Sequence, residues 1–120
     1  MDVVERRRLM REEVLRTARG FAERVKACFG KASVVLIGSY ARGDFNEWSD
    51  VDLLIVVEKA LGNPLERMDY LLERCPPPSG VEPILLSLAE FMRQKQLGSP
   101  LSKEAYSQGV VLVDELGLFH

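Results

Sequence analysis

The stretch GSYARGDFNEWSDVD, residues 38–52, decides how this chain is interpreted. It lies between the apolar runs SVVLI and LLIVV, and short apolar runs with β-branched residues are typical of buried strands. A Gly-Ser pair ends the first run, and Asp-Val-Asp opens the second. We therefore predict strands over Ser33–Ile37 and Asp50–Val57, joined by a turn, with carboxylates at the start of the second strand.

The acidic residues of this region are placed to share one edge of a sheet. Side chains alternate along a strand, so Asp50 and Asp52 lie on one face, about 6.6 Å apart along it. Glu82 has the equivalent place at the start of a third predicted strand, Val81–Leu86. If the second and third strands run parallel, their acidic ends meet. The first strand must then run antiparallel to the second, because only this direction brings Ser39 to the same edge.

Such a group of carboxylates needs a cation, because the negative charges repel one another. Mg²⁺ prefers oxygen ligands, and close carboxylates can hold two ions about 3.5–4 Å apart for a phosphoryl-type displacement. Gly38 leaves room for close backbone approach. The residues after it are expected to begin a helical turn, in which backbone N–H groups and the Ser39 hydroxyl can bind phosphate oxygens. Arg42 is a second candidate phosphate ligand. The alternative is a solvated strand end for Asp50 and Asp52 and a helix N-cap for Ser39.

The rest of the chain alternates between helix and strand. Apolar residues recur every three or four positions from Val14 onward, which predicts an amphipathic helix over residues 3–29, ended by Gly30. Its first ten residues are so charged that we expect it to begin frayed or to project toward a partner. Capping residues and apolar patterns then predict helices that begin at Pro64, Leu88 and Pro100, and an edge strand over Val110–Val113. The predicted order α-β-α-β-α-β-α-α-β describes one α/β domain over residues 1–120, a small mixed sheet flanked by helices.

Two finer predictions concern the buried face of the helix that begins at Pro64 and the state of the two cysteines. Its buried stripe is expected to consist of Leu65, Met68, Leu72 and Cys75. The other cysteine, Cys28, is distant in sequence, and the two lie in no CxxC pattern. We therefore expect buried free thiols rather than a metal site or a redox pair.

Composition limits the classes of protein to which the chain can belong. Its 120 residues, 47% hydrophobic and 28% charged, suffice for one domain with a single core. A net charge of −2 argues against a chain-wide nucleic-acid surface, although residues 1–31 hold nine Lys and Arg against five Asp and Glu. No apolar run approaches the roughly 18 residues of a membrane span, and the N-terminus is too charged for a signal peptide. We expect a cytoplasmic protein that binds neither membranes nor nucleic acid directly.

The segment GSYARGDFNEWSDVDLLIVV (38–57) resembles the signature of the minimal nucleotidyltransferase (MNT) family, in the polymerase-β-like nucleotidyltransferase superfamily. That signature consists of Gly-Ser after a strand, Asp-x-Asp at the start of the next strand, and a further carboxylate on the strand after that. The match includes the Ala-Arg-Gly that follows the Gly-Ser-aromatic. Outside residues 34–57 the order of helices and strands resembles the family more loosely.

The resemblance implies the nucleotidyltransferase fold and a metal-dependent transfer of a nucleoside monophosphate, AMP from ATP, to a hydroxyl group. It implies that Gly38 and Ser39 bind the triphosphate, and that Asp50 and Asp52 hold two Mg²⁺ ions. Glu82 takes the place of the third carboxylate, as a ligand of the catalytic metal or as the base for the attacking hydroxyl. The family often has Asp at this position, so the longer side chain is a departure from its pattern.

The resemblance also bears on partners. At this length no residues remain for an acceptor-binding domain, so we expect the acceptor on a partner chain or on a second subunit of a homo-oligomer. Members of the family are commonly encoded beside HEPN-domain proteins, which implies an antitoxin that binds a HEPN ribonuclease or attaches AMP to it. The alternative is a non-catalytic subunit that uses the same fold to dock its partner, although the complete Gly-Ser and Asp-x-Asp sets favour the enzyme. A transferase for aminoglycosides or tRNA is a third option that needs a further substrate domain.

Overall fold

The predicted order of helices and strands is confirmed in the computed structural model of the chain, which describes residues 1–59 and 62–119. The predicted helical turn directly after the first strand is part of that order. The elements are α1 (Val3–Phe29), β1 (Ala32–Ile37), α2 (Ser39–Arg42), β2 (Val51–Val57), α3 (Pro64–Arg74), β3 (Val81–Ser87), α4 (Leu88–Leu97), α5 (Pro100–Gln108) and β4 (Val110–Asp114).

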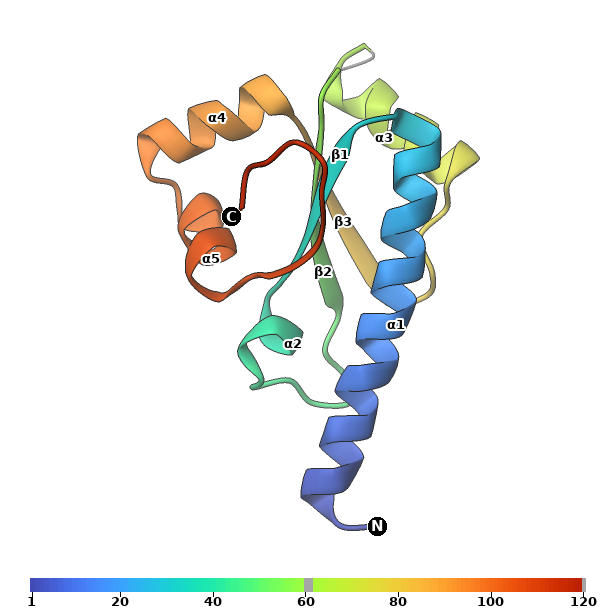
Figure 1. The fold of residues 1–120 in the computed structure, drawn as a ribbon. Helices are drawn as coiled ribbons and strands as arrows, with labels where there is room; N and C mark the ends of the chain where they lie inside the picture. Colours follow the sequence, from blue (N-terminus) through green and yellow to red (C-terminus); the bar gives the residue numbers. More distant parts are fainter. Residues whose placement is uncertain (60–61, 120) are drawn as a thin grey trace.

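The four strands form one mixed sheet in the order β3-β2-β1-β4 (Figure 1). β1 runs antiparallel to β2 and to β4, whereas β2 and β3 run parallel. The directions of β1, β2 and β3 relative to one another are the predicted ones, and β4 lies at the edge as expected. The C-terminal end of β1 therefore lies at the same edge of the sheet as the N-terminal ends of β2 and β3.

Each face of the sheet carries its own hydrophobic core. On one face, Leu36, Leu53 and Ile55 pack against Phe21 and Val25 of α1 and against residues of α3. The other face is covered by α4, α5 and the C-terminal segment, and its core includes Val35, Ile37, Leu54, Val56, Phe91 and Ala105. Figure 1 shows this division, with α1 and α3 on one side of the strands and α4 and α5 on the other. Alternate residues of β2 are thus buried on opposite faces, as the period of two requires.

The helices begin where the sequence places their caps. Asn63 and Ser87 each form a capping box, in which the side chain accepts a hydrogen bond from the backbone of Glu66 or Glu90 and that glutamate bonds back. Ser99 caps α5, which has proline in its first turn. A capping residue marks the start of each of these helices, which explains why their starts were predictable.

The basic N-terminal segment is helical from Val3, so of the two alternatives for its first residues the structure shows no fraying, and projection toward a partner stays a prediction. Asp2 caps α1 by accepting a hydrogen bond from the backbone N–H of Glu5. The first turns extend past the sheet, beside α2 and the loop that follows it (Figure 1). Among the described residues, no helix is both long enough and apolar enough to cross a membrane, and α1 itself is strongly charged.

The predicted stripe of α3 is partly wrong. Leu65 and Leu72 are 71% and 51% exposed, whereas Leu71 is buried and Met68 is partly buried against the core. The remaining buried position belongs to Arg67, whose guanidinium forms a two-point ion pair with Glu90 of α4, at 2.7 and 3.0 Å. A charged residue takes an inward position because a partner from another helix neutralises it. No pattern of apolar residues can indicate this.

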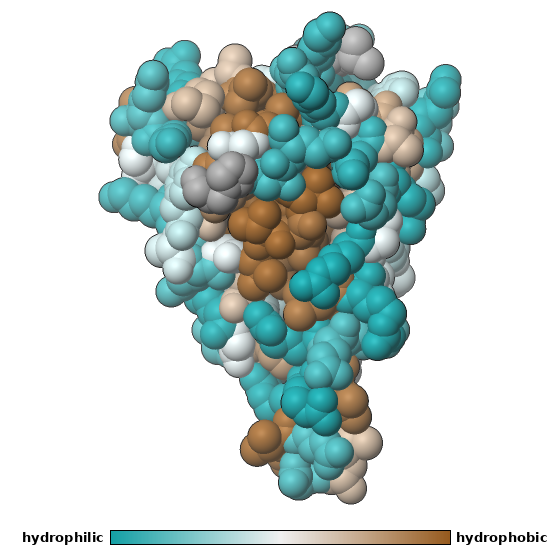
Figure 2. Space-filling model, in the orientation of Figure 1, coloured by the Kyte–Doolittle hydropathy of each residue, from teal (hydrophilic) through white to brown (hydrophobic). Residues whose placement is uncertain are grey.

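The C-terminal segment crosses the sheet and is held by Asp114. This carboxylate accepts hydrogen bonds from the Ser33 hydroxyl (2.8 Å) and from the backbone N–H groups of Leu118 (2.8 Å) and Phe119 (3.0 Å). Phe119 then packs its ring against Phe91, at a centroid distance of 5.5 Å. In Figure 2, hydrophobic side chains are exposed where Figure 1 places β4, whose most exposed residue is Val111 at 41%.

Candidate active site

The carboxylate of Asp52 lies at the centre of the predicted site. Asp52 is opposite Ile37 in the antiparallel pair and opposite Glu82 in the parallel pair. Because Leu54 and Val56 belong to the core beneath α4 and α5, alternation puts Asp52 on that same face. Glu82 precedes Ile84 and Leu86 in the same way. The fold therefore brings Asp52 and Glu82 together on one face of the sheet, as the sequence predicts.

Gly38 lies directly against the Asp52 carboxylate. Its backbone has φ 78° and ψ −159°, a conformation that only glycine adopts readily. A Cβ atom added to Gly38 would clash with Oδ2 of Asp52. Glycine is needed here for two separate reasons, the positive φ and the close approach of the carboxylate.

Asp50 is outside the strand, since β2 begins at Val51. Asp50 and Glu82 are both exposed, whereas Asp52 is half-buried. The pKa of Asp52 is raised, first by burial and then by the negative charges of Asp50, Glu104 and Glu82, and the Arg42 charge opposes this only in part. The neighbouring negative charges therefore disfavour the charged form of the half-buried Asp52.

The donor chemistry of this group fits a hard divalent cation. The side chains of Asp50, Asp52 and Glu82 offer carboxylate oxygens only, and within residues 1–59 and 62–119 none of these three carboxylates has a hydrogen bond or an ion pair. Within the same residues, no three acidic or other metal-ligating side chains are close enough to form a finished metal site. The exposed side chains of Asp50 and Glu82 would have to turn toward Asp52 to complete one.

The turn after β1 presents the candidate phosphate ligands. Ser39 is the first residue of α2, and the carbonyl of Gly38 accepts hydrogen bonds from the N–H groups of Ala41 (3.1 Å) and Arg42 (3.0 Å). Arg42 extends its guanidinium to two acids, Asp44 at 3.3 Å and Glu104 at 3.2 Å. The Gly38-to-Arg42 turn thus places one guanidinium beside the acidic group.

Arginines of α1 hold this turn from outside. Arg7 donates to the carbonyls of Gly43 (2.8 Å) and Phe45 (2.6 Å), and Arg11 donates to the carbonyl of Tyr40 (3.0 Å). The Arg7 guanidinium also covers the Phe45 ring, which stacks on Tyr40 at 4.3 Å. Part of the basic character of the N-terminal helix therefore serves an internal purpose, the support of the site loop.

Glu104 of α5 is the residue that the sequence did not indicate. Its Oε2 accepts a hydrogen bond from the Gly38 N–H at 2.6 Å and contacts Nη1 of Arg42 at 3.2 Å. The contact joins positions 66 residues apart in sequence. A lone glutamate on an amphipathic helix gives no local signal of this role.

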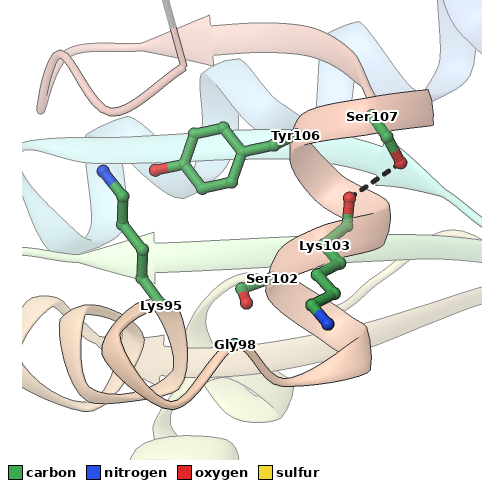
Figure 3. A pocket seen from close by; sticks show the side chains of 6 residues that line it. All are labelled: Lys95, Gly98, Ser102, Lys103, Tyr106 and Ser107. Carbon is green, nitrogen blue, oxygen red and sulfur yellow. Dashed lines mark hydrogen bonds between the residues drawn. The ribbon is translucent and has the colours of Figure 1, made fainter.

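A cavity of about 510 Å³ between α4 and α5 is not part of this site. Figure 3 shows its lining, with the Lys95 and Tyr106 side chains directed toward one another. Its serine hydroxyls are already used, since Ser102 donates to the carbonyl of Ser99 (3.0 Å) and Ser107 donates to that of Lys103 (2.8 Å). Residues on this face of α5 are separate from Glu104, which reaches the Gly38 turn.

Comparisons with known proteins agree with the geometry. The family model described as "Nucleotidyltransferase domain" matches residues 18–105. A crystal structure of a "putative nucleotidyltransferase" from Sulfolobus solfataricus has a TM-score of 0.65 over 92% of this chain and 88% of that chain, at 24% identity, which supports a common fold. A Methanocaldococcus jannaschii protein named "Putative protein adenylyltransferase" is 65% identical over 26 residues, 22% of this chain. That match spans only 26% of the relative's length.

Proposed function

This chain belongs to the nucleotidyltransferase domain family, and we propose that it transfers AMP from ATP to a hydroxyl group on a partner protein. The observation that carries this proposal is the contact of Asp52 with both halves of the site. Its carboxylate lies against Gly38 of the phosphate-binding turn, and its strand position is paired with that of Glu82. The phosphate-binding turn and the acidic residues are therefore close enough to bind the same triphosphate.

The chain's own residues would bind and orient the nucleotide. The Gly38 N–H and the Ser39 hydroxyl donate hydrogen bonds to phosphate oxygens, and the Arg42 guanidinium neutralises their charge. Asp52 lies beside this turn, so the α-phosphate would face the acidic edge of the sheet. Such an arrangement favours reaction mainly by positioning and by electrostatic stabilisation.

Asp50, Asp52 and Glu82 are the residues that would hold Mg²⁺, in a pair of ions if all three carboxylates turn inward. When bound, the metal would supply charge stabilisation for the attacking and leaving oxygens of the displacement. Glu82 is the candidate to accept the proton of the attacking hydroxyl, because its exposed side chain is free to reach an acceptor.

The acceptor is proposed to be a helical HEPN-domain protein, which the chain would neutralise as an antitoxin. The name of the Methanocaldococcus jannaschii relative supports protein as the class of acceptor, within the limits of a 26-residue match. The alternative of a non-catalytic docking subunit predicts the same complex without transfer. The two functions therefore differ in one measurable product, AMP on the partner.

The test uses Asp52→Asn, which keeps the size of the side chain and removes its charge. Wild type and variant are incubated with labelled ATP, Mg²⁺ and a candidate HEPN-domain partner, a helical protein sought in the neighbouring reading frame, and label on that protein is measured. We expect a loss on the order of a thousandfold in transfer rate, because one charge that stabilises the metal is absent. The variant should fold and still bind its partner, since removal of a charge relieves repulsion.

Asp69→Asn is the matched control, because it removes one carboxylate from the exposed surface of α3, away from the site. It should transfer label at the wild-type rate. If neither wild type nor Asp69→Asn labels the partner, while all three proteins neutralise it equally, the docking function replaces the catalytic one.

A further inference from the structure

Glu104 is hydrogen-bonded to two groups that are proposed to bind the triphosphate, the Gly38 N–H and the Arg42 guanidinium. A single oxygen, Oε2, accepts from the Gly38 N–H at 2.6 Å and from Nη1 of Arg42 at 3.2 Å. A phosphate oxygen is recognised by the same combination, a backbone N–H and a guanidinium. The carboxylate therefore satisfies donors that a bound nucleotide would need.

Apart from these two contacts, Glu104 has other negative charges as neighbours. Glu104 is close enough to Asp52 for its charge to act on that group, beside Asp50 and Glu82. Its side chain is 30% exposed, and that of Arg42 is 36% exposed, so solvent can reach the contact. A triphosphate carries more negative charge than Glu104 and binds together with Mg²⁺. It could therefore take over the hydrogen bonds of the Glu104 carboxylate without any change in the core.

We propose that, in the nucleotide-free protein, Glu104 occupies the place between the Gly38 N–H and Arg42 where a phosphate oxygen would bind, and that a triphosphate must displace it in order to bind. That the ligand is a triphosphate rests on the proposed function. Glu104 thereby lowers the apparent affinity for nucleotide, because the binding-competent turn is only partly populated. It also keeps the Gly38 N–H and Arg42 paired while no ligand is present.

Three variants separate occupancy of the turn from general charge. Glu104→Gln retains an acceptor but loses the charge-assisted part of its bonds. Glu104→Asp retains the charge but is one methylene too short for both contacts. Asp44→Asn is the matched control, because Asp44 also pairs with Arg42, at 3.3 Å, and no hydrogen bond joins it to Gly38.

The measurement is the dissociation constant of inorganic triphosphate at saturating Mg²⁺, by titration calorimetry, with melting temperatures as a check on folding. We expect Glu104→Gln to bind about tenfold more tightly than wild type, which corresponds to about 1.4 kcal/mol. Glu104→Asp should also bind more tightly, although it keeps its charge. Asp44→Asn should remain within about twofold of wild type, because electrostatic screening at an exposed pair leaves little effect.

Several results would overturn the inference. Wild-type affinity in both Glu104 variants means that the carboxylate does not compete, and weaker binding means that it holds the turn in its active form. If Glu104→Gln and Asp44→Asn gain the same affinity for triphosphate while Glu104→Asp gains none, the effect comes from net charge alone and not from occupancy of the turn. Absence of triphosphate binding in every variant also rejects it. The AMP-transfer assay is independent, so tighter triphosphate binding without transfer would reject the proposed function alone.

Discussion

At the scale of single residues, the site depends on one glycine. Gly38 combines a positive φ of 78° with a carboxylate at the place where a side chain would begin. Gly30, at the end of α1, has nearly the same backbone, φ 79° and ψ −135°, but nothing lies within 4 Å of its hypothetical Cβ. A comparison of substitutions at the two glycines therefore distinguishes the effect of backbone strain from the effect of the close approach of Asp52.

Gly38→Ala is expected to cost more stability than Gly30→Ala and to damage the site. Both variants carry the strain of a positive φ, about 1–3 kcal/mol, and only Gly38→Ala must also displace the Asp52 carboxylate. Chemical denaturation gives the two free energies of unfolding, and a thermal scan with MgATP reports on the site. Gly30→Ala should retain the stabilisation by MgATP, and Gly38→Ala should lose it. Equal behaviour of the two variants would mean that the contact with Asp52 is unimportant.

At the scale of elements, α3 and α4 are joined by a buried cation. The Arg67 side chain is 3% exposed, and within the described part of the chain its Nε has no hydrogen-bond partner. Glu90 compensates its charge, and hydrogen bonds from Arg67 and from the Ser87 N–H lower the pKa of Glu90 to about 2. The pair links the helix before β3 to the helix after it. It thereby fixes how α4 follows the strand that carries Glu82.

This ion pair predicts a pH-dependent stability. Because the pKa of Glu90 is lowered on folding, its contribution is fully present above the ordinary value of 4.5 and is lost as the pH falls toward about 2. Glu90→Gln should lower the free energy of unfolding at neutral pH by about 2 kcal/mol, less than for a fully buried pair since the Glu90 side chain is 40% exposed. Urea denaturation from pH 7 to pH 2 should show the two proteins converging at the acidic end.

Glu12→Gln provides the control for that series. Glu12 pairs with Arg8 on the exposed surface of α1, at 2.8 Å, with side chains 50% and 58% exposed. Its loss should change stability by less than about 0.5 kcal/mol at any pH. A difference between wild type and Glu90→Gln that persists unchanged at pH 2 would show that packing, and not the charge of Glu90, is responsible.

At the scale of the whole molecule, the candidate site needs five elements at once. β1 leads into Gly38, α2 supplies Ser39 and Arg42, β2 supplies Asp52, β3 supplies Glu82, and α5 supplies Glu104. The arginines of α1 support the connecting loop from the other side. Unfolding of any layer removes the site, so ligand binding and global folding are coupled.

MgATP should therefore raise the melting temperature of the wild-type protein. A ligand that binds only the folded state adds about 2.7 kcal/mol at a hundredfold excess over its dissociation constant. ATP with EDTA should stabilise much less, because the carboxylates would then repel the triphosphate. Differential scanning calorimetry at several nucleotide concentrations checks both statements. An absent shift at millimolar MgATP would contradict nucleotide binding and favour the docking function.

The elements and the topology of the sheet were predictable because their signals are local. Asn63, Ser87 and Ser99 mark helix starts by bonding to backbone N–H groups within the same turn. Alternation along β2 placed Asp52 on the face of Leu54 and Val56, and the short crossover through α3 favoured a parallel β3. The family signature added the nucleotidyltransferase fold, which the structural comparison confirms.

What the sequence by itself determined is thus the order of elements, the direction of the strands and the residues around the Gly-Ser turn. Tertiary structure alone decided which charged groups meet: Arg67 with Glu90, Arg7 with the loop carbonyls, and Glu104 with Gly38. It also buried Cys75 near Cys28, and burial together with the neighbouring thiol raises the pKa of Cys75 to about 11. The physical reason is that caps and periodicity act over a few residues, whereas a charge or thiol finds its partner only when packing brings distant segments together.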